Sequence, residues 1–129
     1  MIVDDDPVYR RTLRALLDDC ELDVVGEAAD GLAGIELAGR LVPDVVVMDY
    51  CMPGLSGLEA TRRLVAGLPG VAVVMCTACD EQLVGDAARQ AGAAAVLFKG
   101  EHPMRLVEAI SRAGAGAATA EPVGAVARG

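Results

Sequence analysis

The sequence predicts an α/β domain built on a parallel sheet. Short apolar runs alternate along the chain with longer segments that have the periodicity of amphipathic helices, as in βαβ units. Several of these runs lack polar alternation, which is typical of parallel strands covered on both faces. The length of 129 residues favours one domain with a single core.

Five strands are expected, and they fall in residues 1–3, 24–26, 45–48, 71–75 and 94–98. The chain has one Phe, two Tyr and no Trp, although 53% of its residues are hydrophobic. Aliphatic side chains and alanine must therefore fill the core, which suits helices packed closely on a sheet.

Five helices are expected beside these strands. Asp6 and Pro7 have the residue types of an N-cap and a first helical position. The other helices are expected from about Leu32 to Leu41 ahead of Pro43, after Ser56 and Glu59 with capping-box spacing, from an Asp80 cap to Gly92, and from Pro103 onward.

The chain divides into a domain of residues 1–113 and an Ala/Gly-rich segment of residues 114–129. The second segment has too little apolar bulk to form a domain, so we interpret it as a linker or tail. A sixth helix packed on the domain is the alternative.

Composition argues against several classes of function. The formal net charge of −8 opposes direct binding to nucleic acid, which depends on a basic face. No apolar stretch approaches the roughly 20 residues that span a bilayer, and the start of the chain does not have the pattern of a signal peptide. We therefore expect a cytoplasmic protein whose four cysteines are reduced.

Polar residues follow four of the predicted strands. They are Asp4, Asp5 and Asp6 after the first, Asp49 after the third, Thr77 after the fourth and Lys99 after the fifth. The carboxyl ends of parallel strands share one edge of the sheet, and ligands bind at that edge. Asp6 is explained more simply as a helix cap.

Clustered carboxylates repel one another unless they take up protons or bind a cation. Hard oxygen ligands with free positions suit Mg²⁺, which keeps waters and is often shared with a phosphoryl group. An aspartate beside this metal can act as a nucleophile, while Lys99 and Thr77 can hold the oxygens of the incoming group.

Four short segments, at residues 3–7, 48–54, 77–78 and 98–99, resemble the signature of two-component response-regulator receiver domains. The resemblance covers about residues 1–113. It implies a flavodoxin-like, doubly wound five-stranded parallel sheet of order 2-1-3-4-5 with five flanking helices.

The resemblance also implies a metal site and a phosphoacceptor. Asp49 would be the phosphoacceptor, and Asp4 and Asp5 would form the acidic pair. Asp5 and Asp49 would coordinate Mg²⁺ together with the backbone carbonyl of Cys51. Asp4 would act partly through water.

Three further positions correspond to the switch of the family. Thr77 would be the switch hydroxyl, and Lys99 would pair with the phosphoryl oxygens. The family usually has Tyr or Phe three residues before this lysine, where this chain has Val96. The aromatic half of the switch is therefore missing.

Residues 24–31 and 57–64 are similar to the LuxR/NarL-type subfamily, whose members usually carry a C-terminal helix-turn-helix domain. This implies a sensor histidine kinase as partner, homodimerisation on phosphorylation, and DNA binding through a domain outside this chain. We interpret the chain as a receiver cut from a longer transcription regulator. It would dephosphorylate itself slowly and turn over no separate substrate.

Two other functions fit the sequence less well. Mg²⁺-dependent phosphatases with an aspartyl-phosphate intermediate place nucleophile and acid two residues apart after the first strand, whereas Asp49 follows the third and is followed by Cys51. A receiver-like interaction module that works without phosphate is favoured by Val96 and opposed by the complete acidic and lysine set.

Cys51 and Cys79 each lie two residues beyond a site residue, Asp49 and Thr77 respectively. In the family these positions border the phosphoryl group and influence its hydrolysis. We expect the cysteines to act as small space-filling residues. The alternatives are a disulfide that closes the site, and a zinc site with His102 that would lack a fourth ligand.

Overall fold

A computed structural model describes residues 1–79 and 81–119 of the chain. Five parallel strands form one sheet in the order β2-β1-β3-β4-β5, which confirms the predicted topology. The strands are β1 (Ile2–Val3), β2 (Glu27–Ala28), β3 (Val45–Asp49), β4 (Ala72–Thr77) and β5 (Ala95–Phe98).

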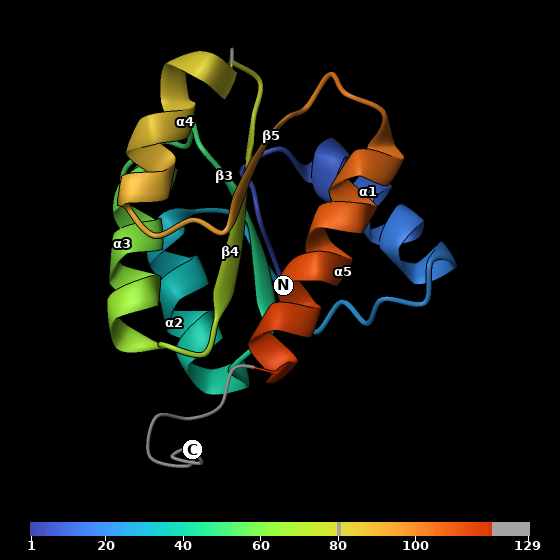
Figure 1. The fold of residues 1–129 in the computed structure, drawn as a ribbon, viewed down its shortest axis with the longest axis horizontal. Helices are drawn as coiled ribbons and strands as arrows, with labels where there is room; N and C mark the ends of the chain where they lie inside the picture. The colour runs from blue at the N-terminus through green and yellow to red at the C-terminus, as the bar shows by residue number, and fades with distance from the viewer. Residues whose placement is uncertain (80, 120–129) are drawn as a thin grey trace.

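The helices cover the sheet on both faces. They are α1 (Pro7–Asp19), α2 (Gly31–Leu41), α3 (Gly57–Gly67), α4 (Glu81–Gln90) and α5 (Pro103–Thr119). Helices α1 and α5 lie on one face, and α2, α3 and α4 lie on the other (Figure 1). Within the described residues, none of the helices has the length and apolar character needed to cross a membrane.

Each face of the sheet has its own aliphatic core. Ala38, Ala60 and Leu64 of α2 and α3 pack on one face, and Leu13 and Ile110 of α1 and α5 pack on the other. Strand β3 is buried along its whole length because it runs between both layers.

Side-chain caps begin α1 and α3 where the sequence indicates. The Asp6 carboxylate accepts a hydrogen bond from Val8 N (2.9 Å), and Ser56 Oγ accepts one from Glu59 N (3.2 Å). The start of α2 is capped by Asp30, which places it one residue ahead of the expected Leu32. The predicted cap Asp80 lies outside the described residues.

The second strand was predicted at residues 24–26, but β2 consists of Glu27–Ala28. Its length is limited by its partner β1, which has two residues and pairs Ile2 with Glu27 and Val3 with Ala28. Val24 is buried against the α1 and α5 layer instead. Val24 is therefore apolar because it packs in the core and not because it joins the ladder, and its neighbour Val25 is exposed.

Helix α5 continues to Thr119, so residues 114–119 are helical in the structure. Alanine favours helix, and the extension of a helix that is already formed needs no new nucleus, so α5 continues in spite of Gly114 and Gly116. Residues 120–129, the rest of the predicted linker or tail, lie outside the described part of the chain.

Helix α3 begins in close contact with the end of β3. Gly57 N donates a hydrogen bond to Tyr50 O (3.1 Å), and a Cβ at Gly57 would overlap the carbonyl oxygen of Asp49. The absence of a side chain at this position lets the helix start directly beside the strand end.

Candidate functional site

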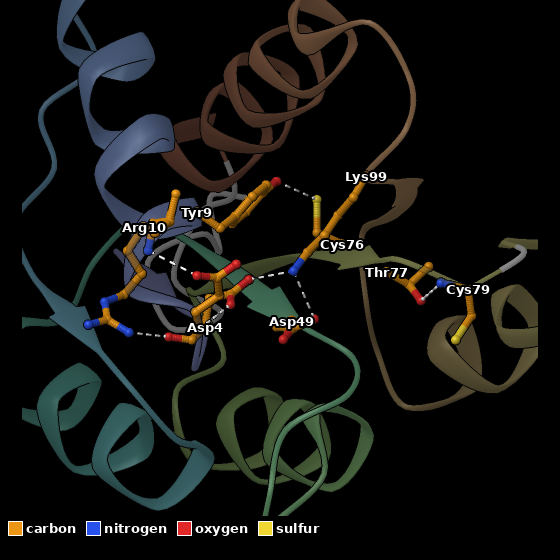
Figure 2. A network of polar contacts seen from close by, with 10 residues as sticks. Asp4, Tyr9, Arg10, Asp49, Cys76, Thr77, Cys79 and Lys99 are labelled. Atoms are coloured by element: carbon orange, nitrogen blue, oxygen red, sulfur yellow. Dashed lines mark hydrogen bonds and ion pairs between the residues drawn. The ribbon is translucent and has the colours of Figure 1, made fainter.

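The carboxyl edge of the sheet gathers the polar residues that the sequence singled out. Asp4 follows β1, Asp49 ends β3, Thr77 ends β4 and Lys99 follows β5. Figure 2 shows the Lys99 side chain reaching from the far strand toward Asp4 and Asp49. The order of the strands produces this arrangement, because β1, β3 and β4 are neighbours at the centre of the sheet.

Three carboxylates form the acidic part of the site. One ligand oxygen from each of Asp4, Asp5 and Asp49 lies within 4.8 Å of the others. Asp4 and Asp49 are buried, with 2% and 5% of their surfaces exposed, whereas Asp5 is exposed. A partly buried oxygen cluster with one open side has the donor chemistry that Mg²⁺ prefers.

Lys99 neutralises part of this charge. Its Nζ lies 2.7 Å from Asp4 Oδ2 and 3.3 Å from Asp49 Oδ1. Burial by itself would lower the pKa of Lys99, but the hydrogen bond to Asp4 and the charge of Asp49 raise the pKa above its usual value. The side chain therefore stays a cation and carries positive charge to the site.

Asp4 is fixed by contacts on several sides. Its Oδ1 accepts a hydrogen bond from Asp6 N (2.8 Å), and its backbone oxygen accepts one from the Arg10 guanidinium (2.6 Å). Arg10 also pairs with Glu27 of β2 at 3.4 Å. Asp4 therefore positions Lys99 and the turn after β1, while the exposed Asp5 has more freedom to meet a metal.

The environment of Asp49 disfavours its charged form. Burial, followed by the charge of Asp4, raises the pKa of Asp49 from 3.8 to about 6, although Lys99 opposes the shift. At neutral pH the carboxylate is mostly ionised, yet its charge is only partly compensated. A divalent cation would relieve this repulsion, so the residues present fit the metal that the family resemblance implies.

Thr77 and Val96 are both buried, Thr77 at the end of β4 and Val96 within β5. Thr77 Oγ1 accepts a hydrogen bond from Cys79 N at 2.9 Å and is not in contact with solvent. Val96 pairs with Met75 across β4 and β5 and packs in the core beneath α4. It fills the place of the usual aromatic residue with a small aliphatic one.

Tyr9 is a site residue that the sequence did not single out. Its ring lies under the Lys99 ammonium, 4.2 Å from Nζ to centroid, and its hydroxyl contacts Cys76 Sγ at 3.6 Å. Burial raises the pKa of Tyr9, so the phenol stays neutral. The sequence signal that could have identified Tyr9 is its place in the first turn of α1, directly after the Asp6 cap at the carboxyl edge of the sheet.

The cysteines divide into two groups, and all four are free thiols in the described part of the chain. Cys51 and Cys79 are exposed beside the site, and Cys20 and Cys76 are shielded. Among the described residues, the acidic trio alone meets the geometry of a shared metal site. The zinc alternative is therefore not supported, and His102 Nδ1 instead accepts a hydrogen bond from Met104 N.

Comparison with known proteins agrees with this arrangement. The chain is 43% identical over 117 residues to the response regulator GacA of Pseudomonas aeruginosa, covering 90% of this chain and 55% of GacA. It is 39% identical over 111 residues to the response regulator UvrY of Escherichia coli K12, covering 85% and 51%. The chain thus spans about half the length of these relatives.

Solved structures show the same fold. The receiver domain of the putative response regulator NarL from Mycobacterium tuberculosis superposes with a TM-score of 0.81 at 36% identity, covering 89% of this chain and 94% of that one. A LuxR-family two-component response regulator from Aurantimonas gives a TM-score of 0.86 at 35% identity, with coverages of 90% and 84%.

The sheet order and the acidic trio beside Lys99 define an α/β receiver domain. The chain belongs to the response regulator receiver domain family, which it matches over residues 1–111. Its similarity to NarL- and LuxR-type regulators agrees with the subfamily predicted from the sequence. It is a receiver domain of two-component signal transduction.

Proposed function

We propose that Asp49 accepts a phosphoryl group from a phosphohistidine on a sensor histidine kinase. A carboxylate oxygen attacks phosphorus, the P–N bond breaks, and the imidazole leaves with the electron pair. The observation that carries this proposal is the position of Asp49, which lies beside Lys99 and beside the carboxylates of Asp4 and Asp5. Lys99 would balance charge on the transferring oxygens without contributing a covalent step.

We propose that Asp5, Asp49 and the backbone carbonyl of Cys51 hold a Mg²⁺ ion, with Asp4 acting partly through water. The metal supplies positive charge to the phosphoryl oxygens when it is bound. The exposure of Asp5 and the several contacts of Asp4 support this division of roles.

The response to phosphorylation involves Thr77. Its hydroxyl turns toward the phosphoryl oxygens and gives up the hydrogen bond that it accepts from Cys79 N. Release of this bond frees the loop between β4 and α4. Val96 limits the change at β5, because an aliphatic side chain cannot swing inward as an aromatic ring does.

The chain is the receiver of a longer regulator in which another domain binds DNA. Support comes from the relatives, which extend to about twice the matched length. The net charge of −8 argues against contact between this domain and DNA. Phosphorylation would favour a homodimer, and the phosphoryl group would leave by slow hydrolysis without turnover of a separate substrate.

A phosphorylation-independent interaction module is the second candidate. The observation that favours it is Val96, which removes the aromatic part of the switch. In this case the acidic trio would bind a cation for stability, and the partner would recognise a fixed surface.

Intact-mass measurement separates the two candidates. The protein is incubated with Mg²⁺ and acetyl phosphate, and the gain of one phosphoryl group is followed. Asp49→Asn should abolish the gain, whereas Asp86→Asn on the exposed face of α4 should retain it. An undiminished gain in Asp49→Asn would contradict the assignment, and no gain in the wild type with either acetyl phosphate or a kinase would favour the module.

A further inference from the structure

The peptide group that joins Asp4 to Asp5 is held by a side chain from α1. Asp4 N still belongs to the sheet, because it donates a hydrogen bond to Ala28 O of β2 (3.1 Å). The carbonyl oxygen of Asp4 instead accepts a hydrogen bond from Arg10 Nη1 (2.6 Å), as Figure 2 shows. A peptide group is planar, so fixing its oxygen also fixes the direction in which the chain continues to Asp5.

Arg10 is itself held by a second contact. Its Nε lies 3.4 Å from Oε1 of Glu27 in β2. Both side chains are partly buried, with 20% and 27% of their surfaces exposed. Two nitrogens of one planar guanidinium therefore face two partners, so the position of Glu27 determines where Arg10 can meet the Asp4 carbonyl.

Arg14, one turn further along α1, shares the glutamate but not the contact with the site. It pairs with the other carboxylate oxygen of Glu27 and donates a hydrogen bond to Val24 O (3.3 Å). None of the contacts described for Arg14 reaches Asp4. Arg14 therefore provides a control that has the same charge and the same partner as Arg10.

We propose that Glu27 and Arg10 are positioning residues of the metal site. Glu27 orients Arg10, and Arg10 holds the Asp4 carbonyl. The turn after β1 then presents Asp5 toward Asp49, and one ligand oxygen of each lies within 4.8 Å of the other. Neither positioning residue touches the metal. The inference rests on the proposed function, in which Asp5 is a direct ligand of Mg²⁺.

The charge and the position of Arg10 predict opposite effects. If its charge alone mattered, loss of a cation close to three carboxylates would strengthen the binding of another cation. If Arg10 positions Asp5, its loss should weaken binding, because Mg²⁺ must then order the turn that carries its ligand. Arg10→Met should therefore weaken Mg²⁺ binding by about tenfold, the lower end of the effect of losing a partner that supports a metal ligand.

Calorimetric Mg²⁺ titration of the full chain tests this effect. Arg14→Met should bind Mg²⁺ as the wild type does, and every variant should bind one ion per chain if it is folded. Glu27→Gln should weaken binding, but it should add nothing to Arg10→Met, since Glu27 acts through Arg10. Unchanged or tighter binding in Arg10→Met, an equal loss in Arg14→Met, or additive losses in the double variant would overturn the proposal.

Phosphorylation by acetyl phosphate separates positioning of the metal from damage to Asp49. Arg10→Met should need about tenfold more Mg²⁺ for its half-maximal rate and should reach the wild-type rate at saturating Mg²⁺. A lowered maximal rate with an unchanged Mg²⁺ requirement would contradict the role in metal binding.

The position of the turn is also measured without metal. The NMR shift of the Asp4 carbonyl carbon reports the hydrogen bond that its oxygen accepts. Arg10→Met and Glu27→Gln should change this shift and that of the Asp5 amide, and Arg14→Met should leave both unchanged. Wild-type shifts in Glu27→Gln would overturn the proposal. Absence of Mg²⁺ binding in the wild type would instead refute the proposed metal site, and these shifts would still decide whether the two residues position Asp5.

Discussion

The Lys99 ammonium lies 4.2 Å from the centroid of the Tyr9 ring while its Nζ pairs with carboxylates of the acidic trio. The face of an aromatic ring attracts a cation, so Tyr9 stabilises Lys99 in its position. The contact of the Tyr9 hydroxyl with Cys76 orients the ring. Helix α1 and strand β5 are thus coupled through Lys99, which among the described ion pairs is the cation that pairs with Asp49.

Replacement of Tyr9 should separate the roles of its ring and its hydroxyl. Tyr9→Leu should lower the free energy of unfolding by about 1–2 kcal/mol, because it removes the cation–π contact of a partly desolvated ammonium. Tyr9→Phe keeps the ring and should cost less. Urea denaturation of both variants measures the difference, and equal losses would show that the ring does not stabilise Lys99.

Lys99→Ala should permit some phosphorylation but weaken the structural response. The variant leaves Asp4 and Asp49 without their ion-pair partner, which should lower the free energy of unfolding by about 2 kcal/mol. Loss of a fully buried pair typically costs about 3–5 kcal/mol, and the loss here is smaller because Lys99 is partly exposed. Chemical-shift changes on adding a beryllofluoride phosphoryl mimic report the response. Wild-type changes in the variant would contradict the role of Lys99, and Arg105→Ala on α5 serves as a cationic control.

The acidic pair should divide into a ligand and a positioning residue. Asp5→Asn removes a direct ligand of the proposed Mg²⁺ site. It should therefore weaken Mg²⁺ binding by at least about tenfold, which is the smallest effect typical of losing a partner that only supports a ligand. Asp4→Asn should reduce binding less and stability more, since Asp4 is buried against Lys99. Calorimetric Mg²⁺ titrations of both variants are compared with Glu36→Gln, which changes an exposed carboxylate in the middle of α2. Indistinguishable curves for the wild type and Asp5→Asn would contradict the metal site.

The raised pKa of Asp49 predicts that the folded state of the metal-free protein loses stability as the pH rises. Between pH 4 and about 6 the folded carboxyl keeps a proton that the unfolded chain has lost, so stability falls as the pH rises through this window. Above about pH 7, Asp49→Asn should therefore be more stable than the wild type by about 2 kcal/mol. The difference should vanish near pH 4. Denaturation curves at both pH values without metal measure it, and a difference that does not change with pH would refute the shift.

The sequence was sufficient for the topology and for the strand-end residues. Parallel strands place their carboxyl ends together regardless of loop detail, so Asp4, Asp49, Thr77 and Lys99 could be assigned to one edge from spacing. The position of β2 could not be found in this way, because its extent is set by pairing with the short β1 and not by its own apolar residues.

Contacts between side chains were harder to predict than the edge itself. Tyr9 reaches the site from the first turn of α1, and its partners Lys99 and Cys76 come from the far end of the chain. These contacts have no signal in periodicity, because they arise from tertiary packing.

Gly57 provides a test of how closely α3 must approach the strand that carries Asp49. A Cβ at this position would overlap the Asp49 carbonyl oxygen and crowd the backbone of Tyr50, so the helix start would have to shift. Gly57→Ala should lower the free energy of unfolding by about 3 kcal/mol, the upper part of the range for overpacked sites.

Gly67 at the other end of α3 is the matched control. A Cβ there meets no atom within 4 Å, so Gly67→Ala should be neutral or stabilising by up to about 1 kcal/mol through helix propensity and loss of chain entropy. Because the overlap in Gly57→Ala falls on Asp49 itself, this variant should also lose Mg²⁺ affinity, and Gly67→Ala should keep it. Chemical denaturation and Mg²⁺ titration of the two variants test both effects. Equal stability of the two variants would mean that α3 can move away from β3 without cost, and the fixed distance between helix and site would then not be a property of this fold.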